Sequence, residues 1–277
     1  MQTINDSAAE QLYKLICASK VFLIAGPCVA ESEDLLMQVS EYLTQYSTQR
    51  NVVYIFKTSF DKANRTSLSS GRGLGLEKTM LIFEKIKNKY KIPITTDIHE
   101  AYQAQEVAAM VDVLQIPAFL CRQTDLLLAA GHTGKIVNIK KAQFMSGADM
   151  HMPAQKVAST GNHKIMLCER GNMYGYHQLV VDYTNIVEMK KAGYPVIMDC
   201  THAVQQPGGM GTATGGNREY VPYLANAAAA VGVHGYFFEV HPNPDKAMSD
   251  GANMLRLNDF ATVFDRVLEH HYLSLKY

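Results

Sequence analysis

Short apolar and β-branched runs recur along the chain, and most are followed by a polar stretch and then by apolar residues at helical spacing. This rhythm predicts strands at 21–28, 52–59, 93–99, 113–119, 136–140, 165–170, 195–202 and 236–241. It predicts helices between them at 34–49, 76–89, 100–111, 185–191, 220–231 and 257–275. Gly193 and Gly232 are typical helix stop signals at the ends of two of these segments.

Eight strands in 277 residues give about 35 residues for each strand and helix, close to the repeat of a closed parallel barrel. No linker rich in proline, glycine or serine divides the series. We therefore predict an α/β protein with a single (β/α)8 TIM barrel domain at 21–277, preceded by an N-terminal extension at 1–20. A doubly wound open sheet is the alternative.

Polar side chains gather at or near the C-terminal ends of the predicted strands, whereas the strand starts are apolar. These polar residues are Cys28, Lys57, Asp97, Gln115, Lys140, Arg170, His202 and Glu239. A single polar residue there could simply mark the exit of a strand to solvent, but every predicted strand carries one. In TIM barrels this face carries the active site, so the pattern favours an enzyme.

The overall charge of the chain bears on which kinds of molecule it can bind. The chain holds 26 Lys and Arg residues against 26 Asp and Glu residues. This balance argues against a general nucleic-acid binder, which needs a basic surface. The start of the chain lacks the apolar centre of a signal peptide, and the uncharged run 220–238 contains Pro222 and Gly232, which suits a helix followed by a strand rather than a membrane span. We expect a cytoplasmic protein without membrane contact.

A basic loop after the second predicted strand is a candidate anion site. Residues 57–72 include Lys57, Lys62, Arg65 and Arg72, with serine and threonine hydroxyls between them. Lysine offers a point charge and arginine a bidentate fork, which suits phosphate or carboxylate groups, although such a loop alone is often only solvated. Further strand-end cations, Lys140 and Arg170, suggest a substrate with more than one anionic group.

A second constellation could bind a divalent metal ion. Cys28, His202, Glu239 and Asp250 offer a thiolate, an imidazole and two carboxylates from strand ends and one following loop. Sequence spacing alone does not specify the set, because no closely spaced ligand motif is present. Because alternate residues of a strand face the same side, Cys200 is expected to face the same way as His202 and is an alternative to Cys28 as the sulfur ligand. His99 and His241 are further possible ligands. The five cysteines are scattered, so a disulfide framework is not expected.

The glycine-rich stretch 208–216 follows a strand and precedes a helix, as a nucleotide-binding loop would. Its glycines do not have the dinucleotide-binding spacing, and it lacks the Lys-Ser/Thr pair of a phosphate-binding loop. We interpret it as a rim loop and expect no nucleotide.

Several rim segments, in order, resemble one enzyme family. They are 26–32, 57–67, 96–100, 115–120, 138–141, 168–171, 199–202 and 239–250. The sequence from about residue 20 onward is similar to that of the 3-deoxy-D-manno-octulosonate 8-phosphate synthases. This family has the TIM barrel fold and condenses phosphoenolpyruvate with arabinose 5-phosphate in the synthesis of the lipopolysaccharide inner core. The resemblance implies a transferase that forms a homotetramer.

The resemblance also implies roles for individual residues. The catalytic residues would be Lys62, Asp97, Lys140 and His202. Phosphoenolpyruvate would be surrounded by Lys57, Ser59, Lys62, Gln115, Ala118 (through its backbone), Lys140 and Arg170. The pentose phosphate would be held by Asn64, Arg65 and Thr66, together with Arg122 of a neighbouring subunit.

Cys28 implies membership of the metal-dependent group of the family, because the metal-free group has asparagine there. The implied ligands are Cys28, His202, Glu239 and Asp250, and the ion would be Fe, Zn, Mn or Co. The sister 3-deoxy-D-arabino-heptulosonate 7-phosphate synthases, which use erythrose 4-phosphate, typically lack an asparagine at the position of Asn64. That enzyme, a sialic acid synthase-like enzyme and a non-catalytic barrel that binds sugar phosphates are the alternatives.

Overall fold

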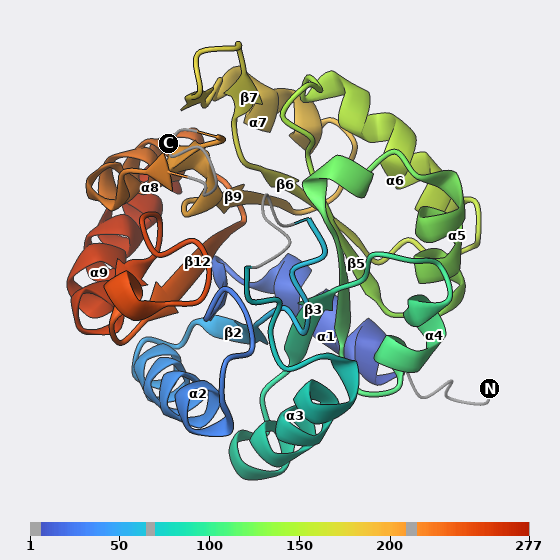
Figure 1. The fold of residues 1–277 in the computed structure, drawn as a ribbon. Coiled ribbons are helices and arrows are strands. Elements are labelled where there is room, and N and C mark those ends of the chain that lie inside the picture. Colours follow the sequence, from blue (N-terminus) through green and yellow to red (C-terminus); the bar gives the residue numbers. More distant parts are fainter. Residues whose placement is uncertain (1–6, 65–69, 209–214, 277) are drawn as a thin grey trace.

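The computed structural model describes residues 7–64, 70–208 and 215–276. Eight parallel strands form a ring at its centre in the order β1-β2-β3-β4-β5-β6-β9-β12, and β12 pairs with β1 to close it (Figure 1). The barrel strands are β1 Phe22–Gly26, β2 Val53–Lys57, β3 Ile94–Asp97, β4 Val113–Ile116, β5 Ile136–Lys140, β6 Ile165–Glu169, β9 Val196–Asp199 and β12 Gly235–His241.

Helices cover the barrel: α1 lies across one end, and the others surround the outer face of the strands (Figure 1). They are α1 Ala8–Ala18, α2 Glu33–Gln49, α3 Leu76–Tyr90, α4 Gln103–Ala108, α5 Thr124–His132, α6 His151–Ala158, α7 Thr184–Lys190, α8 Val221–Val231 and α9 Leu257–Ser274. None of the described helices combines the length and the apolar character that crossing a membrane requires.

The loops contain short strands and 3-10 turns. Two small antiparallel hairpins pair β7 Asn172–Met173 with β8 Leu179–Val180 and β10 Gln205–Gln206 with β11 Gly215–Gly216. A short strand, β13 Leu255–Arg256, extends the sheet beside β12. Single 3-10 turns are η1 Ala118–Leu120, η2 Ala148–Met150, η3 His202–Val204, η4 Arg218–Tyr220 and η5 Pro244–Lys246.

The barrel interior changes from apolar to polar along the strands. Toward the N-terminal ends of the strands, the inward side chains form a buried apolar cluster that includes Phe22, Ile24, Ile55 and Phe237. The next inward position after Phe237 in its strand is Glu239, and the next inward position after Ile55 is Lys57. Because alternate residues of a strand face the same side, the strands bring their polar ends together above an apolar floor.

Helix α1 closes the other end of the barrel. Ile16 is buried with the apolar cluster of the interior, and Leu12 and Tyr13 pack against it. The Tyr13 hydroxyl donates a hydrogen bond to the carbonyl of Ile165, 3.0 Å away, at the start of β6. The segment predicted only as an N-terminal extension therefore contains a helix that completes the core.

The predicted fold class and all eight predicted strands are confirmed. The helix predicted at 100–111 is shorter in the structure, where α4 spans Gln103–Ala108, because residues 101–102 and 109–110 form turns at its two ends. The uncharged run 220–238 forms α8 and β12, as predicted. Helices α1, α5 and α6 were not among the predicted segments.

Candidate functional site

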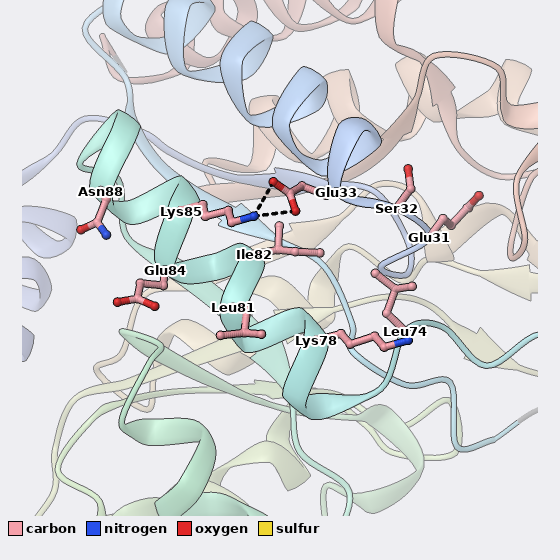
Figure 2. Close-up of a pocket in the computed structure, with 10 residues that line it drawn as sticks. All are labelled: Glu31, Ser32, Glu33, Leu74, Lys78, Leu81, Ile82, Glu84, Lys85 and Asn88. Carbon is pink, nitrogen blue, oxygen red and sulfur yellow. Dashed lines mark hydrogen bonds and ion pairs between the residues drawn. The ribbon is translucent and has the colours of Figure 1, made fainter.

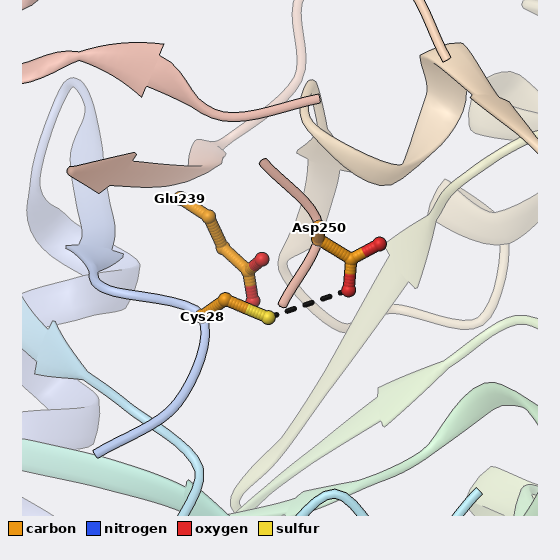
Figure 3. A group of neighbouring side chains, drawn as sticks. All are labelled: Cys28, Glu239 and Asp250. Carbon is orange, nitrogen blue, oxygen red and sulfur yellow. Dashed lines mark hydrogen bonds between the residues drawn. The ribbon is translucent and has the colours of Figure 1, made fainter. Parts of the chain in front are cut away.

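Three side chains with metal-binding groups meet at the polar end of the barrel (Figure 3). Cys28 follows β1, Glu239 lies in β12, and Asp250 lies in the loop before β13. One ligand atom of each lies within 4.8 Å of those of the other two. The Cys28 thiol donates a hydrogen bond of 3.3 Å to Oδ2 of Asp250. Strand β1 can approach β2 closely here because Gly26 lacks a Cβ, which would lie 1.9 Å from the carbonyl oxygen of Lys57.

His202 joins this centre from the end of β9. Its Nε2 lies 3.6 Å from Oε2 of Glu239, and its Nδ1 lies 2.8 Å from Oδ2 of Asp199. The backbone N–H of His202 also donates to Oδ1 of Asp199, at 2.9 Å. With Nδ1–H donating to Asp199, the lone pair of Nε2 points toward Glu239, which is the tautomer that a metal-binding histidine needs.

Cys200 is not a ligand candidate in the structure. Its side chain packs in the hydrophobic core outside the barrel, and its pKa is raised by burial. The expectation that it faces the same way as His202 was wrong, because regular strand alternation ends at Asp199 and η3 then turns His202 inward. His99 packs edge-on against Phe60. His241 lies 3.7 Å from Glu31.

These residues fit a divalent transition metal ion. A thiol, an imidazole and two carboxylates are a common donor set for such ions. Oε2 of Glu239 is buried without a hydrogen-bond partner among the described residues, which a bound cation would supply. Burial and then Glu239 raise the pKa of the Cys28 thiol well above its ordinary value, so a cation is needed to hold it as a thiolate.

Lysines on one side of this centre offset its negative charge. Lys57 is buried, and its Nζ donates to Oε1 of Glu239 at 2.6 Å. The Nζ of Lys62 donates to the Ser59 hydroxyl at 3.0 Å and lies 4.0 Å from Oε1 of Glu239. Burial raises the pKa of Asp97, but Lys57 and Lys62 outweigh it and hold the pKa below its ordinary value. Asp97 is therefore ionised and accepts from Ser59.

A second polar group lies across the barrel mouth. Gln115 donates to Oδ1 of Asp97 at 2.5 Å and accepts from Asn138 at 3.0 Å. The Nζ of Lys140 lies 2.6 Å from Oδ2 of Asp199 and 3.2 Å from the centre of the Phe237 ring. Burial raises the pKa of Asp199, but His202 and Lys140 reverse the shift and keep it below its ordinary value.

Arg170 connects this group to the candidate metal-binding residue Asp250 through Gln205. The Arg170 guanidinium donates to Oε1 of Gln205, whose Nε2 donates to Oδ1 of Asp250 at 2.9 Å. Nη1 of Arg170 is buried without a hydrogen-bond partner among the described residues. An anion that binds at the barrel mouth would supply that partner.

The structure does not bring every predicted residue into this cluster. Ala118 lies in the half-buried turn η1 directly after β4. Asn64 and Arg122 are exposed, and no contact among the described residues joins either to the cluster. Arg65 and Thr66 lie outside the described residues, as does most of the glycine-rich stretch 208–216.

A groove of about 540 Å³ lies outside the barrel, between the start of α2 and helix α3 (Figure 2). Apolar side chains such as Leu74 and Ile82 line it beside the ion pair of Lys85 with Glu33, at 2.8 Å. None of the predicted site residues lines it. The convergence of charged groups therefore places the candidate site at the barrel mouth instead.

Sequence reasoning did not identify Asp199, Gln205 and Asn138 as site residues. Strand alternation could have found two of them, because Asn138 is two residues before Lys140 and Asp199 is two residues after Ile197 of the inner cluster. Gln205 carried no such signal, since it lies in the short strand β10 beyond the barrel.

Comparisons with known proteins agree with this geometry. The sequence matches the DAHP synthetase I family over residues 17–273. A 2-dehydro-3-deoxyphosphooctonate aldolase of Fusobacterium nucleatum subsp. nucleatum is 51% identical over 268 residues, 96% of each chain. A protein of the same name from Syntrophotalea carbinolica is 53% identical over 238 residues, 86% of each chain. One from a Cyanothece strain is 51% identical over 246 residues, 89% of this chain and 90% of the other.

The similarity covers nearly the whole barrel and includes every strand end that contributes to the cluster. The chain therefore belongs to the DAHP synthetase I family and, within it, to the 2-dehydro-3-deoxyphosphooctonate aldolases, also called 3-deoxy-D-manno-octulosonate 8-phosphate synthases.

Proposed function

We propose that the protein condenses phosphoenolpyruvate with D-arabinose 5-phosphate and water, giving 3-deoxy-D-manno-octulosonate 8-phosphate and inorganic phosphate. The observation that carries this proposal is the set of cations around the thiol and carboxylate centre at the barrel mouth. It occurs in a chain half identical to relatives named for this product. The product enters the synthesis of the lipopolysaccharide inner core.

Phosphoenolpyruvate binds between the two cationic sides of the mouth. Lys140 and Arg170 come from adjacent strands and suit its phosphate, with the backbone N–H of Ala118 as a further donor. Lys57, Ser59 and Gln115 complete the group of polar contacts. Most of these side chains are buried, so their hydrogen bonds to an anion form in a site of low polarity, where they are strong.

The pentose phosphate binds at the outer part of the mouth. Asn64, Arg65 and Thr66 follow Lys62 in the loop after β2, and they hold its phosphate and hydroxyl groups. Arg122 is exposed on its own subunit, which suits a role in the site of a neighbouring subunit. This assignment requires a homo-oligomer, and a tetramer is our proposal.

Cys28, His202, Glu239 and Asp250 would hold a divalent metal ion, either Fe, Zn, Mn or Co. When bound, the ion supplies Lewis acidity that can polarise the aldehyde oxygen or orient water. Asp199 fixes the ring of His202, and Lys57 fixes the carboxylate of Glu239. These partners hold the ligands in place before the ion binds.

The reaction begins when the C2–C3 π electrons of phosphoenolpyruvate form a bond from C3 to the aldehyde carbon of the pentose, whose oxygen takes up a proton. Lys62 is the donor near this oxygen, and Asp97 positions Ser59 beside it. Water adds to C2 and loses a proton, which leaves a C2 hydroxyl. The tetrahedral intermediate then expels phosphate by cleavage of the bond between C2 and the phosphate oxygen, while the C2 hydroxyl passes its proton to the departing phosphate and becomes the keto group. Lys140 and Arg170 stabilise the charge on the departing phosphate.

A Schiff base on Lys57 or Lys140 is the mechanistic alternative. The Nζ atoms of both lysines lie 2.6 Å from a carboxylate, and that contact would have to break before either nitrogen could attack a carbonyl carbon. Borohydride treatment in the presence of substrate distinguishes the two routes. Inactivation accompanied by a lysine adduct would overturn the mechanism without a covalent enzyme intermediate.

The function is tested by phosphate release from phosphoenolpyruvate with arabinose 5-phosphate or erythrose 4-phosphate. Assays use the protein as purified, after chelation, and after return of Mn(II) or Fe(II). We expect turnover with the pentose that chelation removes and metal restores. Preference for erythrose 4-phosphate would indicate a sister synthase, no turnover would indicate a binding protein, and activity after verified metal removal would exclude the metal requirement.

A further inference from the structure

Behind the barrel mouth, a buried lysine ties together the loops that follow β5 and β6. Lys141 comes directly after Lys140, and its side chain is fully buried. Its ammonium group lies 2.9 Å from Oδ1 of Asn172, 3.0 Å from the carbonyl of Met145 and 3.3 Å from that of Gly171. The function proposed above assigns it no role.

Glu169 completes this arrangement from β6. Its Oε1 lies 3.4 Å from the Nζ of Lys141 and accepts hydrogen bonds from the backbone N–H groups of Arg170, at 2.9 Å, and Gly171, at 2.6 Å. The carboxylate therefore fixes the backbone on which the Arg170 side chain is mounted. We call Lys141 and Glu169 the buried clamp.

Further hydrogen bonds join the same loops. The amide of Asn172 donates to the carbonyl of Met145 at 2.7 Å, and the backbone N–H of Met173 donates to the carbonyl of Gln143 at 2.9 Å. The segment after β5 and the segment after β6 thus behave as one unit, with the ammonium group of Lys141 at its centre.

The clamp is the outward-facing counterpart of a pair of cations in the mouth. Lys140 and Arg170 point inward, and each is adjacent in sequence to one member of the clamp. The Asp199 carboxylate lies 2.6 Å from the Nζ of Lys140 and also interacts electrostatically with Arg170, so the two cations share one anionic neighbour in the mouth. A rigid connection between the two loops would fix the separation of these two cations, which a single phosphate group must span to contact both.

We propose that Lys141 and Glu169 are positioning residues that set the spacing of Lys140 and Arg170 and so preorganise the phosphate site. The proposal rests on the function proposed above, in which Lys140 and Arg170 bind the phosphate of phosphoenolpyruvate. Neither member of the clamp contacts substrate. A buried ion pair often contributes little net stability, so an effect on binding can be separated from an effect on folding.

The test replaces both members of the clamp. Lys141→Met alone leaves the Glu169 carboxylate buried without its cation, which endangers folding. The double variant Lys141→Met/Glu169→Gln removes both charges and keeps an oxygen that can accept from the N–H groups of Arg170 and Gly171. Lys87→Met is the matched control, because Lys87 also bridges a carboxylate and a backbone carbonyl, but near the opposite end of the barrel.

We expect the double variant to raise the KM for phosphoenolpyruvate and the calorimetric Kd for inorganic phosphate by roughly tenfold to hundredfold, the scale expected for displaced binding groups. The KM for arabinose 5-phosphate should change less than threefold. Lys87→Met should alter thermal stability without altering either KM.

A folded double variant whose KM for phosphoenolpyruvate and Kd for phosphate stay within twofold of the wild type would overturn the proposal. So would an equal rise in the KM of both substrates, which indicates general loosening. If the wild type turns over no phosphoenolpyruvate, the proposed function fails, while the phosphate Kd of wild type and variant still decides whether the clamp shapes an anion site.

Discussion

Gln205 lies between two groups of opposite charge at the barrel mouth. Its amide oxygen accepts from Arg170, and its amide nitrogen donates to Asp250. A glutamine suits this place because a cation needs an acceptor and a carboxylate needs a donor. The anion site and the candidate metal ligand are therefore joined by one side chain.

Replacing Gln205 with methionine should weaken both sites. The variant Gln205→Met keeps the size of the side chain but removes the acceptor of the Arg170 guanidinium and one of the donors to Asp250. We expect the Kd for Co(II) and the KM for phosphoenolpyruvate each to rise by roughly tenfold or more, as is typical when a group that orients a ligand is lost. Co(II) binding is followed through its thiolate absorption band.

The adjacent residue provides the control. Gln206 is the next residue in β10 and is only half-buried, so Gln206→Met should leave both constants near those of the wild type. A Gln205→Met protein with an unchanged Co(II) affinity would show that Asp250 does not depend on this hydrogen bond.

At the scale of the helix, α1 shows how a short amphipathic segment completes the barrel. Ile16 is 1% exposed, whereas its neighbour Leu15 is 53% exposed. Replacing Ile16 with alanine leaves a cavity in the apolar end of the barrel and should lower the free energy of unfolding by about 2–5 kcal/mol. Urea unfolding followed by circular dichroism measures this loss.

Leu15→Ala changes the same helix on its exposed side and should cost at most about 0.5 kcal/mol. Because Ile16 packs against the apolar floor rather than the mouth, Ile16→Ala should retain wild-type kcat and KM under conditions where it is folded. A large loss of activity in folded Ile16→Ala protein would contradict the view that α1 is purely structural.

The strands were predictable because hydrophobic runs of the right length and β-branched content recur with regular spacing. Helix α1 is short and belongs to no strand–helix repeat, so its docking position follows only from the closed barrel. Lys57, Lys140 and Glu239 were predicted from their places at strand ends to lie on the same rim of the barrel, and in the structure Lys57 contacts Glu239 and Lys140 contacts Asp199.

Other parts of the site were not predictable from strand pattern. Gln205 enters the cluster through a hairpin outside the barrel, whereas His202, although predicted from its place at a strand end, enters it through the turn η3, where alternation has ended. Lys141 is a lysine like its neighbour Lys140 but faces the opposite side of the strand. Its role as part of the clamp follows only from its contacts in the structure, such as the one with the carbonyl of Met145.

At the scale of the whole molecule, the last helix contacts the segment before the first barrel strand at the place where the barrel closes. His271 in α9 is 1% exposed, and its Nε2 lies 2.7 Å from the carbonyl of Lys20, just before β1. Its Nδ1 lies 3.0 Å from the hydroxyl of Tyr236 in β12. A neutral imidazole satisfies both contacts, with Nε2–H donating to Lys20 and Nδ1 accepting from Tyr236. The His271 side chain therefore connects α9 to both strands, β1 and β12, whose pairing closes the barrel.

This arrangement predicts a loss of stability on mild acidification. Burial lowers the pKa of His271 below its ordinary value of 6.5. Because the unfolded chain takes up this proton first, the stabilisation from neutral His271 is complete above pH 6.5 and declines as the pH falls toward the folded-state pKa. The decline is at most about 1.4 kcal/mol per pH unit.

Denaturant unfolding of wild type and His271→Gln at pH 8 and pH 5.5 tests this linkage. At pH 8 the variant should be less stable by about 1–3 kcal/mol, since buried hydrogen-bonding groups lose their best partner. The difference should shrink at pH 5.5, because only the wild type loses the stabilisation from His271. His270→Gln alters the exposed neighbour in the same helix and is the control for a histidine replacement away from the contact with Lys20. A wild-type advantage that stays constant between the two pH values would show that His271 does not couple protonation to closure of the barrel.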